Sequence, residues 1–469
     1  MRKASVDILV PSALGLLAGI ALIGWLTWGR STALEPRLPG LDGVPAPASA
    51  ADQAPPEPTG AVQLDGQPSS LPGHWPWFRG VARDAVVADG VPLAREWPDA
   101  GPEVLWEVEL GPGHAGAVVD QGRVFVLDYD PVALADTMRC FSLDDGREIW
   151  RNSYPVEVVE NHGMSRTVSA VKGDYVVSFG PKCHAACWNA KTGDCLWLID
   201  LVLKYGAKVP NWYAGQCPII DGDRVILAPC AESCLIAVDL KTGETVWESE
   251  KVSNWIMTHV SILPMTLGNT RMYVYCGSGG VVGINAEDGK VLWETKDWVG
   301  NMATCPTPVN IGDGRIFFSS GYGAGAKMMR LSENDGTWKI ETLFEMKPKR
   351  FESEQQTPVF CGDHIYGVRT KSGGEQLVCM DLDGNEIWNS GRDKFGRGPY
   401  MVADGLLVLL DDEGLLTLAE ATPEAYRAVA QAQVIADGHD AWAPMALANG
   451  RLIIRDLTRM KCVNLAEAP

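Results

Sequence analysis

Basic residues are scarce in this chain relative to acidic residues. The 469 residues contain 40 Lys and Arg against 59 Asp and Glu, which gives a formal net charge of −19. Nucleic acids and anionic membrane surfaces carry the same sign of charge, so this excess argues against both as partners. We therefore expect no nucleic-acid function.

Several sequence signatures of catalysis are also missing. The chain has no Gly-x-Ser-x-Gly nucleophile elbow and no paired-carboxylate signature. Its Cys and His residues do not follow the order that covalent haem attachment requires. Gly111-Pro-Gly-His-Ala-Gly116 has the glycines of a dinucleotide fingerprint, and Gly321-Tyr-Gly-Ala-Gly325 is rich in glycine, but both lie between expected strands. These absences do not exclude an enzyme.

The chain does contain a repeated motif. In each copy a Gly stands four residues before a Trp, near the end of an apolar-rich stretch. The copies are Gly146–Trp150, Gly193–Trp197, Gly243–Trp247, Gly289–Trp293 and Gly384–Trp388, with a blurred sixth at Gly336–Ile340. The first four Trp residues follow one another at 47, 50 and 46 residues, which is the period of a four-stranded propeller blade. One blade cannot bury both of its faces, so such repeats are stable only as a closed ring.

Counting the repeats predicts an all-β fold, an eight-bladed β-propeller with four-stranded antiparallel blades. The strand around Trp106 has no blade of its own in front of it. Later blades are expected to end at Trp150, Trp197, Trp247, Trp293, Ile340 and Trp388, and a degenerate seventh near Tyr426. Residues 443–465 supply three strands without a fourth. We therefore expect the strand at Trp106 to complete the last blade, so that both ends of the chain close the ring.

Residues 1–30 are expected to form a cytoplasmic tip and one transmembrane helix. Residues 8–28 carry no charge and are long enough to cross a bilayer. Arg2 and Lys3 precede them, which favours a cytoplasmic N-terminus. A cleaved signal peptide is the alternative, although no small-x-small site lies close behind the apolar run. This segment predicts a single-pass membrane protein with the propeller outside the cytoplasm, on the periplasmic side.

The rest of the chain divides into a linker and one domain. Residues 31–72 are rich in Pro, Ala and Gly, which predicts an extended disordered linker. The propeller domain is expected over residues 73–469 and begins near the motif Trp75-Pro-Trp-Phe-Arg-Gly80.

Polar and aromatic residues crowd the segments that lead into the innermost strands of the expected blades. In a propeller these lead-in segments share one face with the loops between strands two and three, so they predict a ligand-facing funnel. The candidate residues are His114, His162, Arg166, Tyr213, Gln216, His259, Gln355, Gln356, Arg397, His439, Asp440 and Trp442. His259 and His439 stand four blades apart and would face each other across the axis. Alternatively, these side chains fill the axis and satisfy backbone groups around trapped water.

A second cluster combines cysteines with a histidine. Cys183, His184 and Cys187 fall in one expected blade, and Cys230 and Cys234 in the next. Both groups follow the second strand of their blade, so we expect them to be neighbours on the funnel face. Thiolates and an imidazole at this density suit zinc or another soft metal. In an oxidising compartment the cysteines could instead form disulfides, and buried free thiols are a third possibility.

The Asp-x-x-Thr-Gly-x-x-x-Trp phrase, complete at residues 239–247, resembles the tryptophan-docking repeat of PQQ-like (quinoprotein-type) propellers. The resemblance covers about residues 100–465. The family includes pyrroloquinoline quinone dehydrogenases and the propeller lipoprotein of the outer-membrane β-barrel assembly machinery. The motif at Trp75–Gly80 is similar to the opening of membrane-anchored or secreted members with no assigned activity.

The resemblance implies two classes of function, because the superfamily mixes catalysts with binders. The first is a membrane-tethered extracytoplasmic binding or scaffold module whose funnel face takes an unknown protein, glycan or small ligand. A rigid ring presents side chains at little conformational cost, which suits recognition. Dehydrogenases of the family join adjacent cysteines in a disulfide over the quinone, and this chain has no Cys-Cys pair. It also has no Cys before Cys140 that could carry a lipid anchor.

The alternative is a quinone- or metal-dependent oxidoreductase with its site in the same funnel. The resemblance then implies pyrroloquinoline quinone with calcium as cofactors. The candidate acid–base, charge-stabilising and stacking residues would be His259, His439, Asp440, Arg166 and Trp442. A hydrolase or lyase is a third hypothesis.

Overall fold

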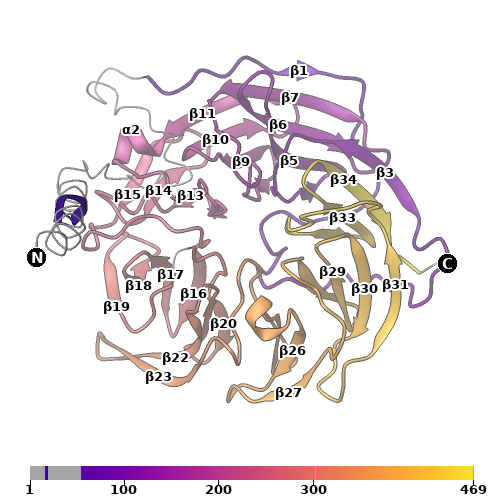
Figure 1. Cartoon of the computed structure of the whole chain (residues 1–469). Coiled ribbons are helices and arrows are strands. Elements are labelled where there is room, and N and C mark those ends of the chain that lie inside the picture. The colour runs from indigo at the N-terminus through magenta and orange to yellow at the C-terminus, as the bar shows by residue number, and fades with distance from the viewer. Residues whose placement is uncertain (1–15, 20–53, 301–302, 468–469) are drawn as a thin grey trace, which may run out of the picture.

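The strands form eight sheets arranged around a central axis in the computed structural model, which describes residues 16–19, 54–300 and 303–467 (Figure 1). Every sheet contains the four antiparallel strands of one blade, which follow one another along the chain in seven of the eight blades. The first strands of neighbouring blades contact one another, so they line the axis. The predicted all-β, eight-bladed propeller with four-stranded antiparallel blades is therefore confirmed.

The first four blades follow one another along the chain. Blade 1 contains β4 (Val118–Asp120), β5 (Arg123–Asp130), β6 (Ala135–Ser142) and β7 (Glu148–Pro155). Blade 2 contains β8 (Ala170–Lys172), β9 (Tyr175–Phe179), β10 (His184–Asn189) and β11 (Cys195–Asp200), followed by the short helix α2 (Leu201–Tyr205). Blade 3 contains β12 (Ile219–Asp221), β13 (Arg224–Leu227), β14 (Ile236–Asp239) and β15 (Thr245–Glu248). Blade 4 contains β16 (Leu263–Leu267), β17 (Thr270–Gly277), β18 (Gly280–Asn285) and β19 (Val291–Thr295).

The second half of the ring repeats the pattern. Blade 5 contains β20 (Val309–Gly312), β21 (Arg315–Ser320), β22 (Gly325–Asn334) and β23 (Thr337–Met346). Blade 6 contains β24 (Val359–Cys361), β25 (His364–Val368), the 3-10 turn η2 (Lys371–Gly373), β26 (Leu377–Met380) and β27 (Glu386–Asn389). Blade 7 contains β28 (Tyr400–Ala403), β29 (Leu406–Leu410), β30 (Leu415–Glu420) and β31 (Ala428–Gln433). Blade 8 contains β32 (Ala446–Ala448), β33 (Arg451–Arg455), β34 (Arg459–Asn464) and, from the other end of the chain, β3 (Val104–Glu109).

Blade 8 closes the ring with strands from both ends of the chain, as the strand count predicts. β3 pairs antiparallel with β34, with Trp106 opposite Cys462. Figure 1 shows this junction as the purple β3 lying beside the yellow β34. The pairing leaves β3 as the outer strand of a complete four-stranded sheet.

The glycine of each repeat is the surface on which the Trp of the preceding blade packs. A Cβ atom on Gly193 would lie 2.5 Å from the ring of Trp150, and one on Gly243 would lie 2.8 Å from the ring of Trp197. Both glycines also have positive φ, of 76° and 71°, which other residues rarely adopt. The Trp150 indole N–H then donates to the Ala190 carbonyl of blade 2 at 3.1 Å. The repeat therefore encodes the contact between neighbouring blades.

The two degenerate repeats depart from this rule. No atom lies within 4 Å of the Cβ position of Gly336, and Phe344 of β23 occupies the place of the docking Trp, on Gly384. The outer strand β23 extends to Met346, so the residue that packs on the next blade is Phe344, not the expected Ile340. In blade 7 the outer strand β31 begins only after Tyr426, whose ring packs on Trp388 with centroids 5.9 Å apart.

Part of the segment expected to be a disordered linker is ordered. β1 (Val62–Gln63) pairs antiparallel with β7, and the Leu64 N–H continues the ladder to the Ile149 carbonyl at 2.8 Å. The outer edge of blade 1 offers unpaired backbone groups, and this strand satisfies them. The linker predicted over residues 31–72 is therefore wrong for its C-terminal part.

The transmembrane segment expected at residues 8–28 lies outside the described residues, apart from residues 16–19. Among the residues that are described, no helix is long and apolar enough to cross a bilayer.

Residues 75–87, which we call the axial clasp, contact the inner strands of five blades. Trp75 pairs with Val119 of blade 1, and the Val171 N–H of blade 2 donates to the Pro76 carbonyl at 2.7 Å. Further hydrogen bonds reach blades 3, 6 and 7, through Arg83, Arg79 and Ala85. β2 (Val86–Val87) ends the clasp in a parallel pairing with β28. The motif that opens the domain therefore ties distant blades together.

Arg79 is the most heavily hydrogen-bonded side chain of the clasp, and Arg79→Ala is expected to lower the free energy of unfolding by about 2–3 kcal/mol. Its guanidinium is buried and donates to the carbonyls of Arg83, Asp84, Thr357 and Pro358. The substitution would leave these carbonyls unpaired away from water. Urea denaturation measures the change, with Arg95→Ala as control, since Arg95 is half exposed and should cost at most about 1 kcal/mol. Equal midpoints for the two variants would contradict the role of the clasp.

Candidate functional site

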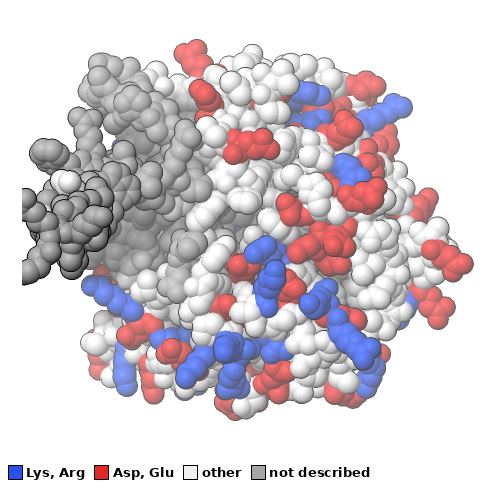
Figure 2. All heavy atoms as spheres, in the orientation of Figure 1, with Lys and Arg blue, Asp and Glu red and all other residues white. Residues whose placement is uncertain are grey.

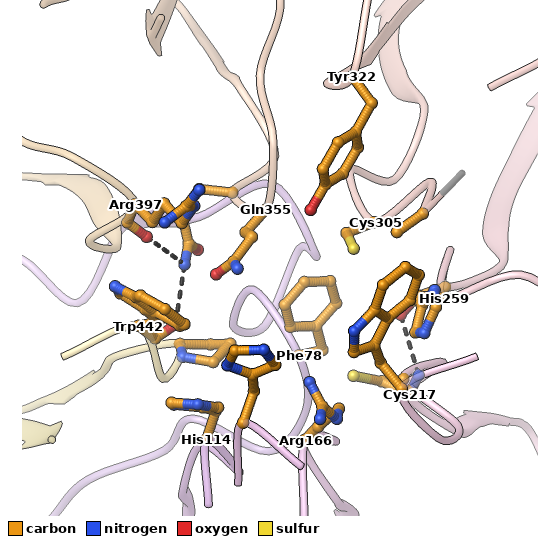
Figure 3. A pocket seen from close by; sticks show the side chains of 17 residues that line it. Phe78, His114, Arg166, Cys217, His259, Cys305, Tyr322, Gln355, Arg397 and Trp442 are labelled. Atoms are coloured by element: carbon orange, nitrogen blue, oxygen red, sulfur yellow. Dashed lines mark hydrogen bonds between the residues drawn. The ribbon is translucent and has the colours of Figure 1, made fainter. Parts of the chain in front are cut away.

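A cavity of about 310 Å³ lies on the axis, at the face where the chain leads into the innermost strands. We call it the funnel pocket. Each blade contributes at least one lining residue from its lead-in segment: His114, His162 and Arg166, Trp212 and Cys217, His259, Cys305, Gln355 and Gln356, Arg397, and Trp442. The loop between β21 and β22 adds Tyr322, and the clasp adds Phe78, which Figure 3 shows at the centre of the ring of side chains.

Backbone and side-chain hydrogen bonds between neighbouring lead-in segments hold this lining in place. The His114 N–H donates to the Ser165 carbonyl at 2.7 Å, and the His259 N–H donates to the Thr304 carbonyl at 3.2 Å. Gln356 donates through its side chain to the carbonyls of Arg397 and Trp442, at 3.1 and 2.9 Å. The pocket is therefore built on fixed segments of all eight blades.

Two predicted funnel residues are buried in the protein instead of facing the pocket. The Tyr213 hydroxyl exchanges hydrogen bonds with the backbone of Val159, and the ring is fully buried. Gln216 is also fully buried, and its amide pairs with both backbone groups of Ala228. These two side chains satisfy backbone groups, as the alternative interpretation of axis filling expects.

The predicted pair of His259 and His439 across the axis does not form. His259 lines the pocket, whereas the side chain of His439 is 63% exposed and lies beside Asp440. Asp437 and Asp440 have positive φ, and this turn places both His439 and Asp440 outside the lining. Trp442, two residues further along, reaches the pocket and stacks on His114 with ring centroids 5.1 Å apart.

The sequence analysis missed several lining residues, two of which carry a usable signal. Trp212 precedes the chosen Tyr213 by one residue, and a positive φ at both residues decides which ring faces the cavity. Tyr322 belongs to the glycine-rich segment between two strands of blade 5. That loop joins strands two and three of its blade, and such loops lie on the same face as the lead-in segments. Phe78 lies in the opening motif, which the repeat pattern does not place.

Arg166 and Arg397 supply the positive charge of the pocket in different ways. Arg397 forms an ion pair with Glu354, and its guanidinium lies 5.3 Å from the centre of the Trp442 ring. Arg166 donates to the carbonyls of Asn161 and Gly163 at 2.6 and 3.0 Å. Burial lowers the pKa of Arg166 to about 10, so the side chain stays charged at neutral pH. Outside the pocket, acidic and basic side chains are interspersed over the described part of the face seen in Figure 2.

The buried histidines of the pocket are neutral at physiological pH. Burial, together with the nearby charges of Arg166 and Arg455, lowers the pKa of His114 to about 3. Burial likewise lowers the pKa of His259 to about 4, with a second contribution from Arg166. Neutral imidazoles both donate and accept hydrogen bonds, so these rings offer recognition groups without added charge.

The cysteine cluster does not form a metal site in the described part of the chain. Cys183, Cys187, Cys230 and Cys234 are buried free thiols, and no group of three or more His, Cys, Asp or Glu side chains there could hold a metal ion. Burial raises the pKa of Cys183 well above the usual thiol range, which opposes thiolate ligation. His184 faces Asp200 at 3.4 Å instead. In the described structure these cysteines therefore form neither a metal site nor disulfides. They are buried free thiols, the third possibility considered above.

A buried carboxyl group near His184 predicts a pH dependence of stability. Burial raises the pKa of Asp136 from 3.8 to about 7, an effect that the Tyr154 hydroxyl and His184 only partly offset. The folded protein therefore keeps a proton that the unfolded chain loses above pH 3.8, so this group lowers stability as pH rises from 3.8 to 7. Above that pH the loss is complete.

Asp136→Asn is expected to remove this dependence. Relative to the parent chain, the variant should gain about 2–3 kcal/mol of unfolding free energy between pH 5 and pH 8. Denaturant titrations at the two pH values measure the difference, and the exposed Asp65→Asn serves as control. If the difference in unfolding free energy between Asp136→Asn and the parent chain were the same at pH 5 and pH 8, Asp136 would be ionised at both pH values.

Comparison with known proteins shows the family of this propeller. A family model described as "Outer membrane protein assembly factor BamB" matches residues 134–382, more than half of the chain. The chain is 26% identical over 188 residues to the outer membrane protein assembly factor BamB of Yersinia pestis, covering 39% of this chain and 45% of that protein. It thus spans less than half of the length of this curated relative.

One solved structure shows the same fold. The crystal structure of BamB from Moraxella catarrhalis aligns with a TM-score of 0.54 and 13% identity, covering 77% of this chain and 99% of that chain. A europium-containing methanol dehydrogenase aligns with a TM-score of 0.40 and 11% identity, over 82% of this chain and 89% of that chain, which carries no argument about activity. The resemblance to PQQ-like propellers that include the assembly lipoprotein is confirmed, and the chain belongs to the family of the outer membrane protein assembly factor BamB.

Proposed function

We propose that this chain is a membrane-tethered, extracytoplasmic binding module that holds a partner protein at its funnel face. The observation that carries the proposal is the funnel pocket itself, to which all eight blades contribute side chains held by interblade hydrogen bonds. A rigid surface of this kind loses little conformational entropy on binding. Residues 8–28 would provide the tether.

The side chains of the pocket favour recognition. Within the described part of the chain, both ring nitrogens of His114 and Nδ1 of His259 are buried and have no hydrogen-bond partner. Buried polar atoms normally have partners, so a ligand group that supplies them would be stabilised. Aromatic rings beside them, above all Trp442, give an incoming chain a large apolar contact. The family name suggests a partner among the proteins of outer-membrane assembly.

Site-specific photo-crosslinking in the full chain tests which face binds. A benzophenone amino acid at Tyr322, on the rim of the pocket, is compared with one at Asp313, in the turn between β20 and β21 at the other end of the same blade. Tyr322 is 42% exposed, and the side chain of Asp313 is 90% exposed, so a crosslinker at either position can reach a bound partner. The proposal expects one partner to crosslink from position 322 and not from 313. Crosslinking from 313 alone, or equally from both, would refute it.

A further inference from the structure

Among the described residues, Arg166 is a cation without an acidic partner. Within that part of the chain its guanidinium donates to the carbonyls of Asn161 and Gly163, and its Nε has no hydrogen-bond partner. The ionisable groups that act on its charge most favourably are Cys305, Tyr213 and Tyr322, and no carboxyl group is among them. Burying an unpaired charge is costly, so such groups are normally compensated.

Three other buried or half-buried arginines of this chain show how such a charge is compensated. Arg139 binds Glu148 and Asp128 at 2.9 and 3.1 Å, and Arg455 lies 3.7 Å from Asp128. Arg79 has no carboxylate but donates to four carbonyls. Arg166 has no carboxylate partner among the described residues and donates to two carbonyls, against four for Arg79. It alone of these four arginines lines the funnel pocket.

The surroundings of Arg166 favour an anion. Of the residues that the structure describes, no Asp or Glu side chain lines the pocket. The nearby carboxylate of Glu354, which acts on the lining residues Cys305 and Tyr322, is paired with Arg397. His114 and His259 offer the unpartnered nitrogens described above, and these can donate to the same group. Arginine binds a carboxylate through parallel N–H donors, which is the strongest pairing available to it in proteins.

The shape of the pocket adds a second requirement. Phe78 closes the floor, and Trp212, Tyr322 and Trp442 stand around it, so the walls are flat and largely apolar (Figure 3). Because Phe78 belongs to the clasp that spans the axis, a ligand enters from the funnel face and ends in the pocket. A cavity of about 310 Å³ has room for an aromatic ring with its attached group.

We infer that the funnel pocket binds a carboxylate borne on a flat apolar group, with Arg166 holding the carboxylate and the ring lying between Phe78 and the tryptophans. This inference rests on the proposed function, in which the carboxylate is the free C-terminus of a partner that ends in an aromatic residue. A free aromatic acid has the same chemistry and is the other source.

Isothermal titration of the full chain tests the inference with two matched pairs of probes. The first pair is a tripeptide ending in Phe as the free acid and as the amide, and the second is phenylacetate and phenylacetamide. Each acid is expected to bind about tenfold or more tightly than its amide. Binding of both acids identifies a chain end, whereas binding of phenylacetate alone identifies a free acid as the source; both results support the carboxylate site. Equal binding of acid and amide, or no binding of any probe, would overturn it.

Two variants assign the preference to Arg166. Arg166→Gln is expected to bind acid and amide equally, and Arg166→Lys to keep a weaker preference, since it retains the charge without the forked donors. Arg271→Gln makes the same charge change at an exposed ion pair with Asp221 and should keep the full preference. Thermal denaturation confirms that the variants are folded. Retention of the full preference in folded Arg166→Gln would refute the inference.

The outcomes also separate this inference from the proposed function. If Tyr322 fails to crosslink a partner but the acids still bind through Arg166, the pocket is a small-acid site and the protein-binding proposal fails alone. If a partner crosslinks at Tyr322 but acids and amides bind alike, the funnel face binds protein and the carboxylate inference fails alone.

Discussion

Deletion of the chain after Ala443 is expected to abolish the cooperative fold. The deletion removes β32, β33 and β34 and leaves β3 without a sheet. It also removes a set of fully or nearly fully buried side chains, Leu447, Leu452, Ile453, Ile454, Met460, Cys462, Val463 and Leu465. Burial of one such side chain is worth about 1.5–3 kcal/mol, so their sum of about 12–24 kcal/mol is as large as the whole stability of an ordinary domain, about 5–15 kcal/mol.

The measurement is thermal unfolding followed by circular dichroism, together with size-exclusion chromatography. The full chain should give one cooperative transition, and the truncated chain should give none and should aggregate. A shorter deletion that removes only residues after Leu465 keeps every strand and serves as control. A monomeric truncation product with a sharp transition would mean that the ring closes elsewhere.

Trp150→Ala is expected to lower the free energy of unfolding by about 4 kcal/mol. Trp150 is fully buried between blades 1 and 2, and its ring centroid lies 6.0 Å from that of Phe125. Alanine would leave a cavity against Gly193 and would remove the indole hydrogen bond to the Ala190 carbonyl. Urea denaturation at equilibrium measures the loss.

Two further variants identify blade docking as the cause. Trp338→Ala is the matched control, because Trp338 is only half-buried on the edge strand β23 and packs on no repeat glycine, and it should cost about 1 kcal/mol. Gly193→Ala should be destabilising even though it adds a methyl group, since its Cβ would meet Trp150 at a positive φ. Equal costs for Trp150→Ala and Trp338→Ala would show that docking on the glycine contributes nothing.

The repeat made the ring predictable from sequence because one contact recurs between neighbouring blades. Closure followed from counting strands, as the pairing of β3 with β34 shows. The count was least accurate where the contact changes its residues. Phe344 replaces a Trp on Gly384, and a local pattern of Gly and Trp cannot show that substitution in advance. The order of residues 59–66 was missed because composition does not reveal an unpaired edge on β7.

The site was predictable in position but not in every side chain. The rule that lead-in segments share a face identified His114, Arg166, His259 and Arg397, which the structure brings together around one cavity. Which side chain of a lead-in segment points inward depends on single φ angles, as Trp212 and His439 illustrate. Phe78 arrives from a segment outside the repeat, so only the tertiary structure places it.

Native mass spectrometry of the full chain, purified from the cells that produce it naturally, tests the funnel pocket as the binding site most directly. The parent chain and Arg271→Gln are predicted to carry a bound partner or ligand, and folded Arg166→Gln is predicted to carry much less of it. A bound species retained equally by all three proteins, or the bare chain mass in each, would contradict the account.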